Sequence, residues 1–293
     1  MMNASDRSFV VLDSRRNVSM TSWIQQNRTN SRVFQVSPHD TFTWYHDGMR
    51  VCNLESLKNT IVHEGANATL ELVQRSMSLQ LLADQSRRAD LSGPPLQEIH
   101  RKIGRCLASA LLDEYGTFMD LVESTAFPHV QGSMYEAFIP ASRNVAIVPL
   151  MRGGEPMSRG VFEMFPGATL IHHSSEKDDA CMDNLCRFLR MNTHDEGPNG
   201  DRVPVKNVIL VDSVINRGNS IRHVLREMDN RTKTLTIRSC QVFVLSGVTQ
   251  LQAAKDLPRE FPRVRFLTLR ISRNQFTGKG GTDTGNRLFG TIL

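Results

Sequence analysis

The residues best suited to chemistry follow an apolar run, Val208–Val211, where Asp212 opens a polar loop that ends at Ser220. Within this loop Gly218 lets the backbone approach a ligand closely, because glycine has no Cβ. If a helix begins just after it, the free backbone amides and the Ser220 hydroxyl form a cradle for a phosphate dianion. Asp212 would lie beside the cradle and could bind a ribose hydroxyl. The spacing indicates a phosphate and ribose site, although other parallel α/β proteins also contain a strand–Asp–Gly–helix loop.

Alternating strands and helices would position this loop. Continuous apolar runs, typical of strands that are buried on both faces, occur at residues 145–150, 168–172, 207–211, 240–245 and 264–271. Helical segments are predicted between them, from the glycine-containing loop at 152–156 to about 165, and over 219–228 and 249–257. Strands joined by helices of this length favour right-handed crossovers and an α/β fold with a five-stranded, mostly parallel sheet flanked by helices. Ligands of such sheets bind at the carboxyl ends of the strands, where Asp212 is expected.

The N-terminal part of the chain has a different pattern. Residues 1–66 are polar and weakly periodic, with short candidate strands at 32–36 and 42–45. We predict that this part is an extension of unassigned structure, and that residues 67–293 form one α/β domain.

Two helices are predicted at the start of that domain. Apolar residues recur at helical spacing from Leu70 to Leu81. A second helix begins at Gly93-Pro94-Pro95, because proline is favoured in a first turn, and Gly116 is a suitable place for it to end.

The composition favours a globular protein that is not embedded in a membrane. The chain has 293 residues, of which 40% are hydrophobic and 22% charged, and these are ordinary proportions. No apolar run approaches the roughly 20 residues that span a bilayer, and the first 20 residues lack an apolar signal core. We therefore expect a cytoplasmic location, with a nuclear one left open.

The five cysteines favour free thiols in a reducing compartment, because their number is odd and none has C-x-x-C spacing. Cys181 and Cys186 lie near His172 and His173, but this spacing matches no common zinc module.

The net charge of +5 suits anionic ligands such as phosphates. No dense Lys/Arg run and no aromatic–basic interleaving is present, which makes nucleic acid the less favoured partner. No G-x-x-x-x-G-K-[ST] motif occurs, so phosphotransfer from ATP is not expected.

Three ordered motifs resemble the uracil branch of the type I phosphoribosyltransferases. Asp212–Ser220 is similar to the loop that binds phosphoribosyl diphosphate (PRPP), and Ile147–Met157 is similar to the I-V-P-x-L-R-A-G-x-x-M segment. Thr282–Thr291 is similar to the closing G-D-x-G-D-R-x-F-G-T segment. The resemblance covers about Leu70 to the C-terminus. It implies the type I phosphoribosyltransferase fold with a small hood or flap, and a homo-oligomer that is a dimer or larger.

The resemblance also implies a reaction, in which a uracil nitrogen displaces diphosphate from PRPP and gives UMP, with Mg²⁺ accompanying PRPP. Arg152 would contact the diphosphate, because a guanidinium fork suits phosphate oxygens. Asp212 would bind ribose hydroxyls, through or beside Mg²⁺. The other implied contacts are to the 5′-phosphate, from Arg217, Gly218, Asn219 and Ser220, and to the base, from Gly281, Thr282 and Asp283.

Several ligand positions depart from the family pattern. Asn216 and Arg217 stand where the loop usually reads Ala-Thr, so a phosphate-binding hydroxyl is missing and less room is left for the base. Residues 276–283 replace an apolar base segment, Asn286 replaces an acid, and Ala83 replaces an arginine. These departures leave three hypotheses open: a PRPP-dependent transferase, a catalytically silent relative that binds a nucleotide or a protein partner, and an RNA-binding regulator on the same scaffold.

Overall fold

The computed structural model describes residues 44–46, 49–51, 70–73, 77–117, 119–173, 182–186, 205–232, 240–275, 278 and 280–291. The chain divides into two units, Met1–Thr60 and Ile61–Leu293. In the first unit, β1 (Trp44–His46) and β2 (Met49–Val51) form an antiparallel pair. The predicted strand at 42–45 overlaps β1, whereas the one at 32–36 and the expected boundary at residue 66 lie outside the described residues.

The second unit is built on a six-stranded sheet with the order β3-β10-β9-β8-β6-β7. All neighbouring strands pair in parallel. The strands are β3 (Leu70–Leu72), β6 (Val145–Pro149), β7 (Thr169–Leu170), β8 (Asn207–Ile215), β9 (Gln241–Gln250) and β10 (Val264–Ser272). Five of them coincide with the five apolar runs of the sequence, and every residue of β6 is buried, as expected for a strand covered on both faces. The predicted parallel α/β sheet is therefore confirmed.

The sixth strand, β3, shows that the helix predicted from Leu70 to Leu81 is wrong at its start. Leu70–Leu72 pair with β10, and α3 begins only at Met77. The Val73 backbone N–H continues this pairing by donating to the Thr268 carbonyl at 2.9 Å. Leu70 and Leu72 are both buried, at the two-residue spacing of a strand. The apolar residues of this short segment fit helical and strand spacing almost equally well. Pairing with the edge of β10 makes Leu70–Leu72 a strand.

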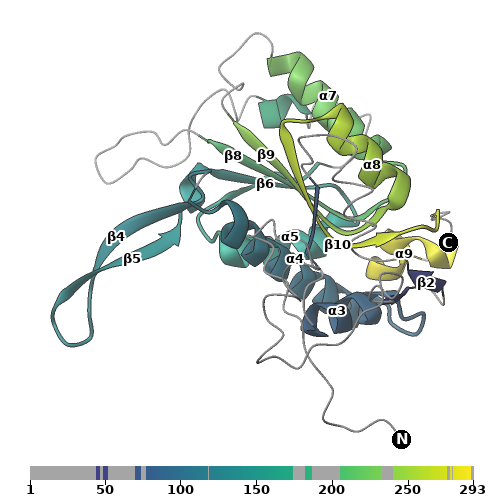
Figure 1. The fold of residues 1–293 in the computed structure, drawn as a ribbon, viewed down its shortest axis with the longest axis horizontal. Coiled ribbons are helices and arrows are strands. Elements are labelled where there is room, and N and C mark those ends of the chain that lie inside the picture. The colour runs from purple at the N-terminus through teal and green to yellow at the C-terminus, as the bar shows by residue number, and fades with distance from the viewer. Residues whose placement is uncertain are drawn as a thin grey trace, which may run out of the picture. The chain divides into compact units, whose positions relative to one another are not determined.

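Helices cover both faces of the sheet (Figure 1). On one face lie α3 (Met77–Arg87), α4 (Gly93–Tyr115) and α5 (Gly154–Met164). On the other face lie α7 (Asn219–Thr232) and α8 (Leu251–Glu260). The predicted start and end of α4 are confirmed, with Pro94 and Pro95 in its first turn and Gly116 at its C-terminal cap.

The helix α5, which follows the Arg152 loop, packs unusually close to α4. A Cβ at Gly104 of α4 would lie 2.0 Å from the Met157 carbonyl oxygen, and one at Gly160 of α5 would lie 1.8 Å from the Arg101 carbonyl oxygen. Only glycine permits this separation of the two backbones. Buried side chains such as Leu107 and Val161 belong to the apolar core that continues from these helices onto the sheet.

Two segments of the chain lie outside these layers. The hairpin of β4 (Val122–Pro128) and β5 (Met134–Pro140) extends away from the sheet (Figure 1), and the short helix η1 (Ser142–Asn144) leads from it to β6. The C-terminal segment contains η3 (Gly280–Thr282) and α9 (Thr284–Phe289). Among the described residues, no helix is long and apolar enough to cross a bilayer.

Candidate functional site

The loop predicted to bind phosphate connects β8 to α7. The strand continues to Ile215, past its predicted end at Val211, so that Asp212 lies within β8 and pairs in register with Ser246 of β9. The chain then turns, and α7 begins at Asn219, where the sequence predicted a helix. The turn depends on Gly218, whose φ of 78° lies in the left-handed region that favours glycine.

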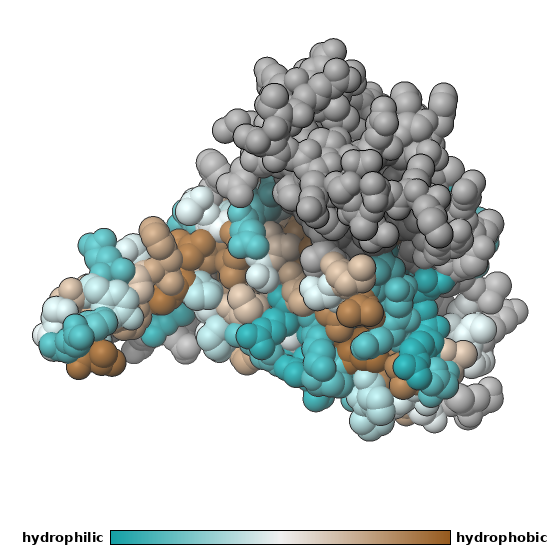
Figure 2. Space-filling view, turned by 60° about the horizontal axis from the view of Figure 1, so that its bottom comes forward, coloured by the Kyte–Doolittle hydropathy of each residue, from teal (hydrophilic) through white to brown (hydrophobic). Residues whose placement is uncertain are grey.

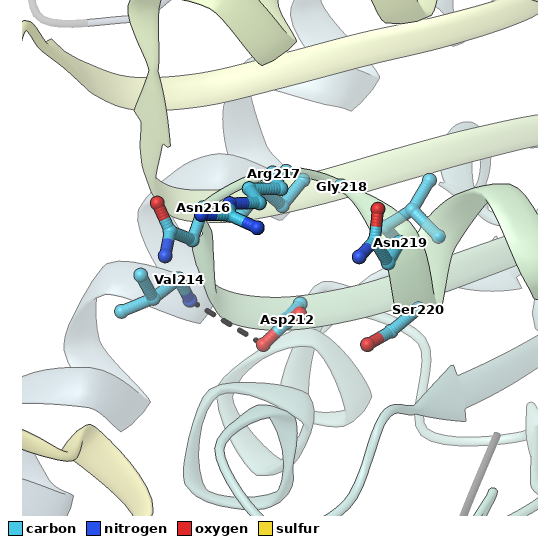
Figure 3. Close-up of a pocket in the computed structure, with 9 residues that line it drawn as sticks. Asp212, Val214, Asn216, Arg217, Gly218, Asn219 and Ser220 are labelled. Atoms are coloured by element: carbon cyan, nitrogen blue, oxygen red, sulfur yellow. Dashed lines mark hydrogen bonds between the residues drawn. The ribbon is translucent and has the colours of Figure 1, made fainter. Parts of the chain in front are cut away.

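A pocket of about 240 Å³ lies over this loop. It is lined by one continuous stretch of chain, namely Asp212, Val214, Ile215, Asn216, Arg217, Gly218, Asn219, Ser220 and Ile221. Figure 3 shows the Ser220 hydroxyl turned toward the side of the loop on which Asp212 lies. The first backbone amides of a helix have no carbonyl partner within the helix, so the start of α7 offers donors to an anion beside this carboxyl.

The half-buried carboxyl group of Asp212 contacts the backbone of its own strand and is approached by the loop that carries Arg152. The Val214 backbone N–H donates to Asp212 Oδ1 at 3.3 Å. A Cβ at Gly153, the residue after Arg152, would lie 3.5 Å from the same oxygen, so the backbone of the Arg152 loop lies close to the Asp212 carboxyl. Burial raises the pKa of Asp212 to about 7, and the amides of Val214 and Ser213 offset part of this rise because they stabilise the carboxylate. Asp212 therefore changes its protonation state near neutral pH.

Arg152 lies on the loop between β6 and α5, and its guanidinium contacts the C-terminal segment. Nη1 donates to Thr291 Oγ1 at 2.7 Å, and Nη2 donates to Asn286 Oδ1 at 2.9 Å. The Met151–Arg152 peptide bond is cis. The next residue, Gly153, packs against β8: a Cβ there would lie 2.6 Å from Ser213 Oγ. The Arg152 loop thus links β8 to the C-terminal segment, and the three sequence motifs meet at the carboxyl ends of the parallel strands.

The residues predicted to contact the base are placed differently. Asp283 is the N-cap of α9, where its Oδ1 accepts a hydrogen bond from the Asn286 backbone N–H at 2.8 Å. Gly281 and Thr282 belong to η3 and are exposed. None of these three residues lines the pocket over the β8–α7 loop. The structure therefore brings together the predicted phosphate and ribose residues, and the base contacts stay a prediction.

Two features of the site were not predicted from the sequence. One is the close approach of Gly153 to Asp212, and the other is the pair of bonds from Arg152 to Asn286 and Thr291. The spacing carried no signal for these bonds, because 134 and 139 residues separate Arg152 from its two partners. The replacement of the family's acid by Asn286 was the one available hint.

The family model for uracil phosphoribosyltransferase matches residues 73–291, which is more than half of the chain. The chain belongs to the uracil phosphoribosyltransferase family. This match contains all three motifs and confirms the resemblance on which the type I phosphoribosyltransferase fold was predicted.

Two members of the uracil phosphoribosyltransferase family show how divergent this chain is. It is 24% identical to the uracil phosphoribosyltransferase of Staphylococcus carnosus over 151 residues, which are 52% of this chain and 68% of the relative. It is 25% identical to the enzyme of the same name from Synechococcus elongatus over 159 residues, 53% of this chain and 68% of the relative. Among solved structures, the AQ2163 protein of Aquifex aeolicus has the same fold, with a TM-score of 0.57, 16% identity, and coverage of 76% of this chain and 99% of its own.

Proposed function

We propose that this chain transfers the phosphoribosyl group of PRPP to uracil, with UMP and diphosphate as products. The observation that carries the proposal is the pocket that Asp212 and the N-terminal turn of α7 line together, with the Ser220 hydroxyl turned toward the side of Asp212. A helix of 14 residues presents a positive dipole end and free amides to an anion. Asp212 supplies hydrogen-bond acceptors for ribose hydroxyls on the other side of the same pocket. Membership of the uracil phosphoribosyltransferase family supports uracil as the base.

In this reaction, N1 of uracil bonds to C1 of the ribose while the bond between C1 and the diphosphate oxygen breaks, and the proton of N1 passes to the departing diphosphate or to water. The chain's residues position the reactants: the amides at Asn219 and Ser220 take the 5′-phosphate, Asp212 takes ribose hydroxyls, and Arg152 takes the leaving diphosphate. Holding two substrates in reactive geometry and stabilising a developing charge are together sufficient for large rate enhancements. The reaction requires no covalent intermediate with the protein.

Arg217 replaces the phosphate-binding hydroxyl that the family pattern has in this loop. It lines the pocket and is exposed, so its charge is available to a phosphate. Its backbone carbonyl accepts a hydrogen bond from Arg222, which also donates to Glu260 at 2.7 Å and ties the loop to α8. We propose that a charge-assisted contact from the Arg217 guanidinium compensates for the lost hydroxyl.

Mg²⁺ enters this proposal as part of the substrate, bound to PRPP. Asp212 is the one carboxylate among the residues that line the described pocket. Mg²⁺ is commonly bound by one or two carboxylates together with substrate phosphates and water. A single enclosed carboxyl beside the phosphate cradle fits this donor set.

Incubation of the full chain with Mg²⁺, PRPP and uracil tests the proposal. We expect UMP and diphosphate to form in equal amounts. If no diphosphate is released with uracil or with any other pyrimidine, the proposal is wrong. Thermal-shift measurements with PRPP, UMP and UTP then test the silent-relative hypothesis, which predicts stabilisation by a nucleotide without turnover.

A further inference from the structure

The turn between β8 and α7 is held by Arg222, which lies in the first turn of α7. The Arg222 side chain donates from Nη1 to the Arg217 carbonyl, and the Arg222 backbone N–H donates to the Gly218 carbonyl at 2.9 Å. Two successive carbonyls of the loop are therefore bound by one residue. Arg222 itself does not line the pocket over this loop.

The direction of these two carbonyls determines where the following amides point. The Arg217–Gly218 and Gly218–Asn219 peptides are trans, and a planar trans peptide directs its C=O and N–H groups to opposite sides. The N–H groups of Gly218 and Asn219 therefore point away from Arg222. Both residues line the pocket, where Figure 3 shows them along the turn. Successive N–H groups at such a turn form a concavity that binds anions.

The helix α8 supports Arg222 and the turn from outside the pocket. Glu260, the last residue of α8, accepts a hydrogen bond from Arg222 Nε at 2.7 Å and another from Arg226. A carboxylate at this end of a helix faces the negative end of the helix dipole, so the two arginines stabilise it there. Leu257 is fully buried on the same helix, and a Cβ at Gly218 would lie 3.2 Å from its Cδ1.

The two arginines that share Glu260 differ in what else they contact. Arg226 bonds Glu260 and has a side chain that is 62% exposed. Arg222 bonds both Glu260 and the Arg217 carbonyl, and its side chain is only 20% exposed. A partly buried ion pair is screened less by salt than an exposed one. The contacts of Arg222 therefore connect α8 to the loop, whereas those of Arg226 connect α8 to α7.

From these contacts we infer that Arg222 and Glu260 are positioning residues, which direct the Gly218 and Asn219 amides toward the 5′-phosphate of the substrate. The inference rests on the proposed function, because it takes a phosphate monoester as the ligand of this loop. It adds two side chains that lie outside the pocket and act through the loop backbone.

Calorimetric titration of the full chain with UMP tests the inference through Arg222→Gln, which removes the bond to the Arg217 carbonyl. If the released loop presents its amides correctly about one tenth of the time, the affinity for UMP falls about tenfold, and we expect this loss. Arg226→Gln is the matched control, since it removes the same charge and one bond to the same carboxylate. We expect it to change the affinity less than about twofold.

Glu260→Ala separates positioning from a simple effect of charge. Removal of this negative charge would strengthen the binding of a phosphate dianion if charge alone mattered. Loss of positioning has the opposite sign, and we expect the affinity for UMP to fall about threefold or more. In the double variant Arg222→Gln/Glu260→Ala the affinity should fall no further than in Arg222→Gln, because Glu260 acts through Arg222. A tighter complex of Glu260→Ala with UMP would contradict the inference.

Uridine, which lacks the phosphate, distinguishes positioning from a general loss of structure. We expect its affinity, measured by displacement of bound UMP, to be the same in Arg222→Gln as in the wild type. Equal losses for UMP and uridine would overturn the positioning role. Wild-type affinity of Arg222→Gln for UMP would overturn it too and leave the proposed function intact. If the wild type itself does not bind UMP, the proposed function and this inference both fail.

Discussion

Asp212 is the residue whose environment differs most from that of an ordinary surface acid. Its side chain lines the same pocket as the N-terminal turn of α7, and desolvation at this position makes the carboxylate form costly. Binding of PRPP with its Mg²⁺ would bring a cation to this carboxyl and lower its pKa again. The protonation state of Asp212 and the binding of substrate are therefore expected to be coupled.

The raised pKa of Asp212 predicts a pH dependence of stability. Its pKa rises from 3.8 to about 7 on folding, because the folded state favours the protonated carboxyl. The contribution of this group to the free energy of unfolding is therefore fully present below about pH 4 and is lost as the pH rises through 7. The free energy of unfolding of the ligand-free wild type should therefore fall relative to that of Asp212→Asn between these values, by about 4 kcal/mol in total. Urea unfolding at pH 4.5 and pH 8 measures this difference.

The half-buried Asp256 of α8 does not line the pocket, so Asp256→Asn serves as the control for that measurement, and we expect its effect on stability to be similar at both pH values. A stability difference between wild type and Asp212→Asn that does not vary with pH would show that the carboxyl is not destabilised by burial.

Arg217 gives a second prediction at the level of a single residue. Arg217→Ala removes a cation from the pocket, and we expect the affinity for PRPP to fall about tenfold, which corresponds to about 1.4 kcal/mol. The salt dependence of binding should also become weaker, because one charge fewer contacts the phosphate. Arg226→Ala is the control, since Arg226 pairs with Glu260 and does not line the pocket. Equal affinities of the two variants would contradict the assigned role of Arg217.

The sequence predicted the residues that line the phosphate and ribose pocket better than it predicted the contacts to the base. Asp212, Gly218 and Ser220 are close in sequence, and a strand, a turn and a helix start are enough to bring them together. The contacts of Arg152 with Asn286 and Thr291 join distant parts of the chain, and side-chain hydrogen bonds over such separations leave no periodic pattern. They became visible only once the elements had been placed in space.

At the level of elements, the close packing of α4 on α5 determines where the Arg152 loop lies. The loop joins β6 to α5, and α5 is held against α4 through Gly104 and Gly160. The apolar periodicity predicted α4, since this helix buries one apolar face. The ends of α4 were predicted from Pro94, Pro95 and Gly116, and α5 was predicted from the glycine-containing loop that precedes it. These signals could not predict how closely the two helices approach, because that depends on the absence of two side chains at the crossing.

Gly104→Ala tests this packing, because close packing predicts that the substitution lowers the stability of the fold and not that it raises it. At an exposed position inside a helix, replacement of glycine by alanine stabilises by about 1 kcal/mol. Here the new Cβ would lie 2.0 Å from the Met157 carbonyl oxygen, so we expect destabilisation of about 2 kcal/mol or more. The melting temperature of the variant reports the sign. The exposed Asp113→Ala on the same helix should leave the melting temperature nearly unchanged, and an increase for Gly104→Ala would contradict the close packing.

At the level of the second unit, the most unusual surface is the β4–β5 hairpin. Its large apolar side chains are exposed, and Figure 2 shows them as hydrophobic patches on the projecting arm. They are Val130, Met134, Tyr135 and Phe138, with exposed fractions of 96%, 65%, 48% and 78%. Exposed apolar patches are a common feature of protein–protein and membrane interaction sites. Because the family resemblance implies a homo-oligomer, we propose a second copy of the chain as the partner of this hairpin.

A double substitution on the hairpin, Met134→Ser with Phe138→Ser, tests that proposal. We expect the mass measured by sedimentation to shift toward the monomer at micromolar concentration, because the apolar area available for association falls. The fold itself should persist, since neither side chain contributes to the core. An unchanged oligomer, or a wild type that is already monomeric, would rule out the hairpin as the contact.

The central claim is that the pocket over the β8–α7 loop serves transfer of phosphoribosyl to uracil. Its most direct test is the uracil-dependent release of diphosphate from PRPP and Mg²⁺, measured for the wild type and for Ser220→Ala. We predict one diphosphate for each UMP formed by the wild type, and a rate that is lower by roughly tenfold or more in the variant, which lacks one donor to the 5′-phosphate. A wild type that releases no diphosphate with uracil or any other pyrimidine would contradict the claim.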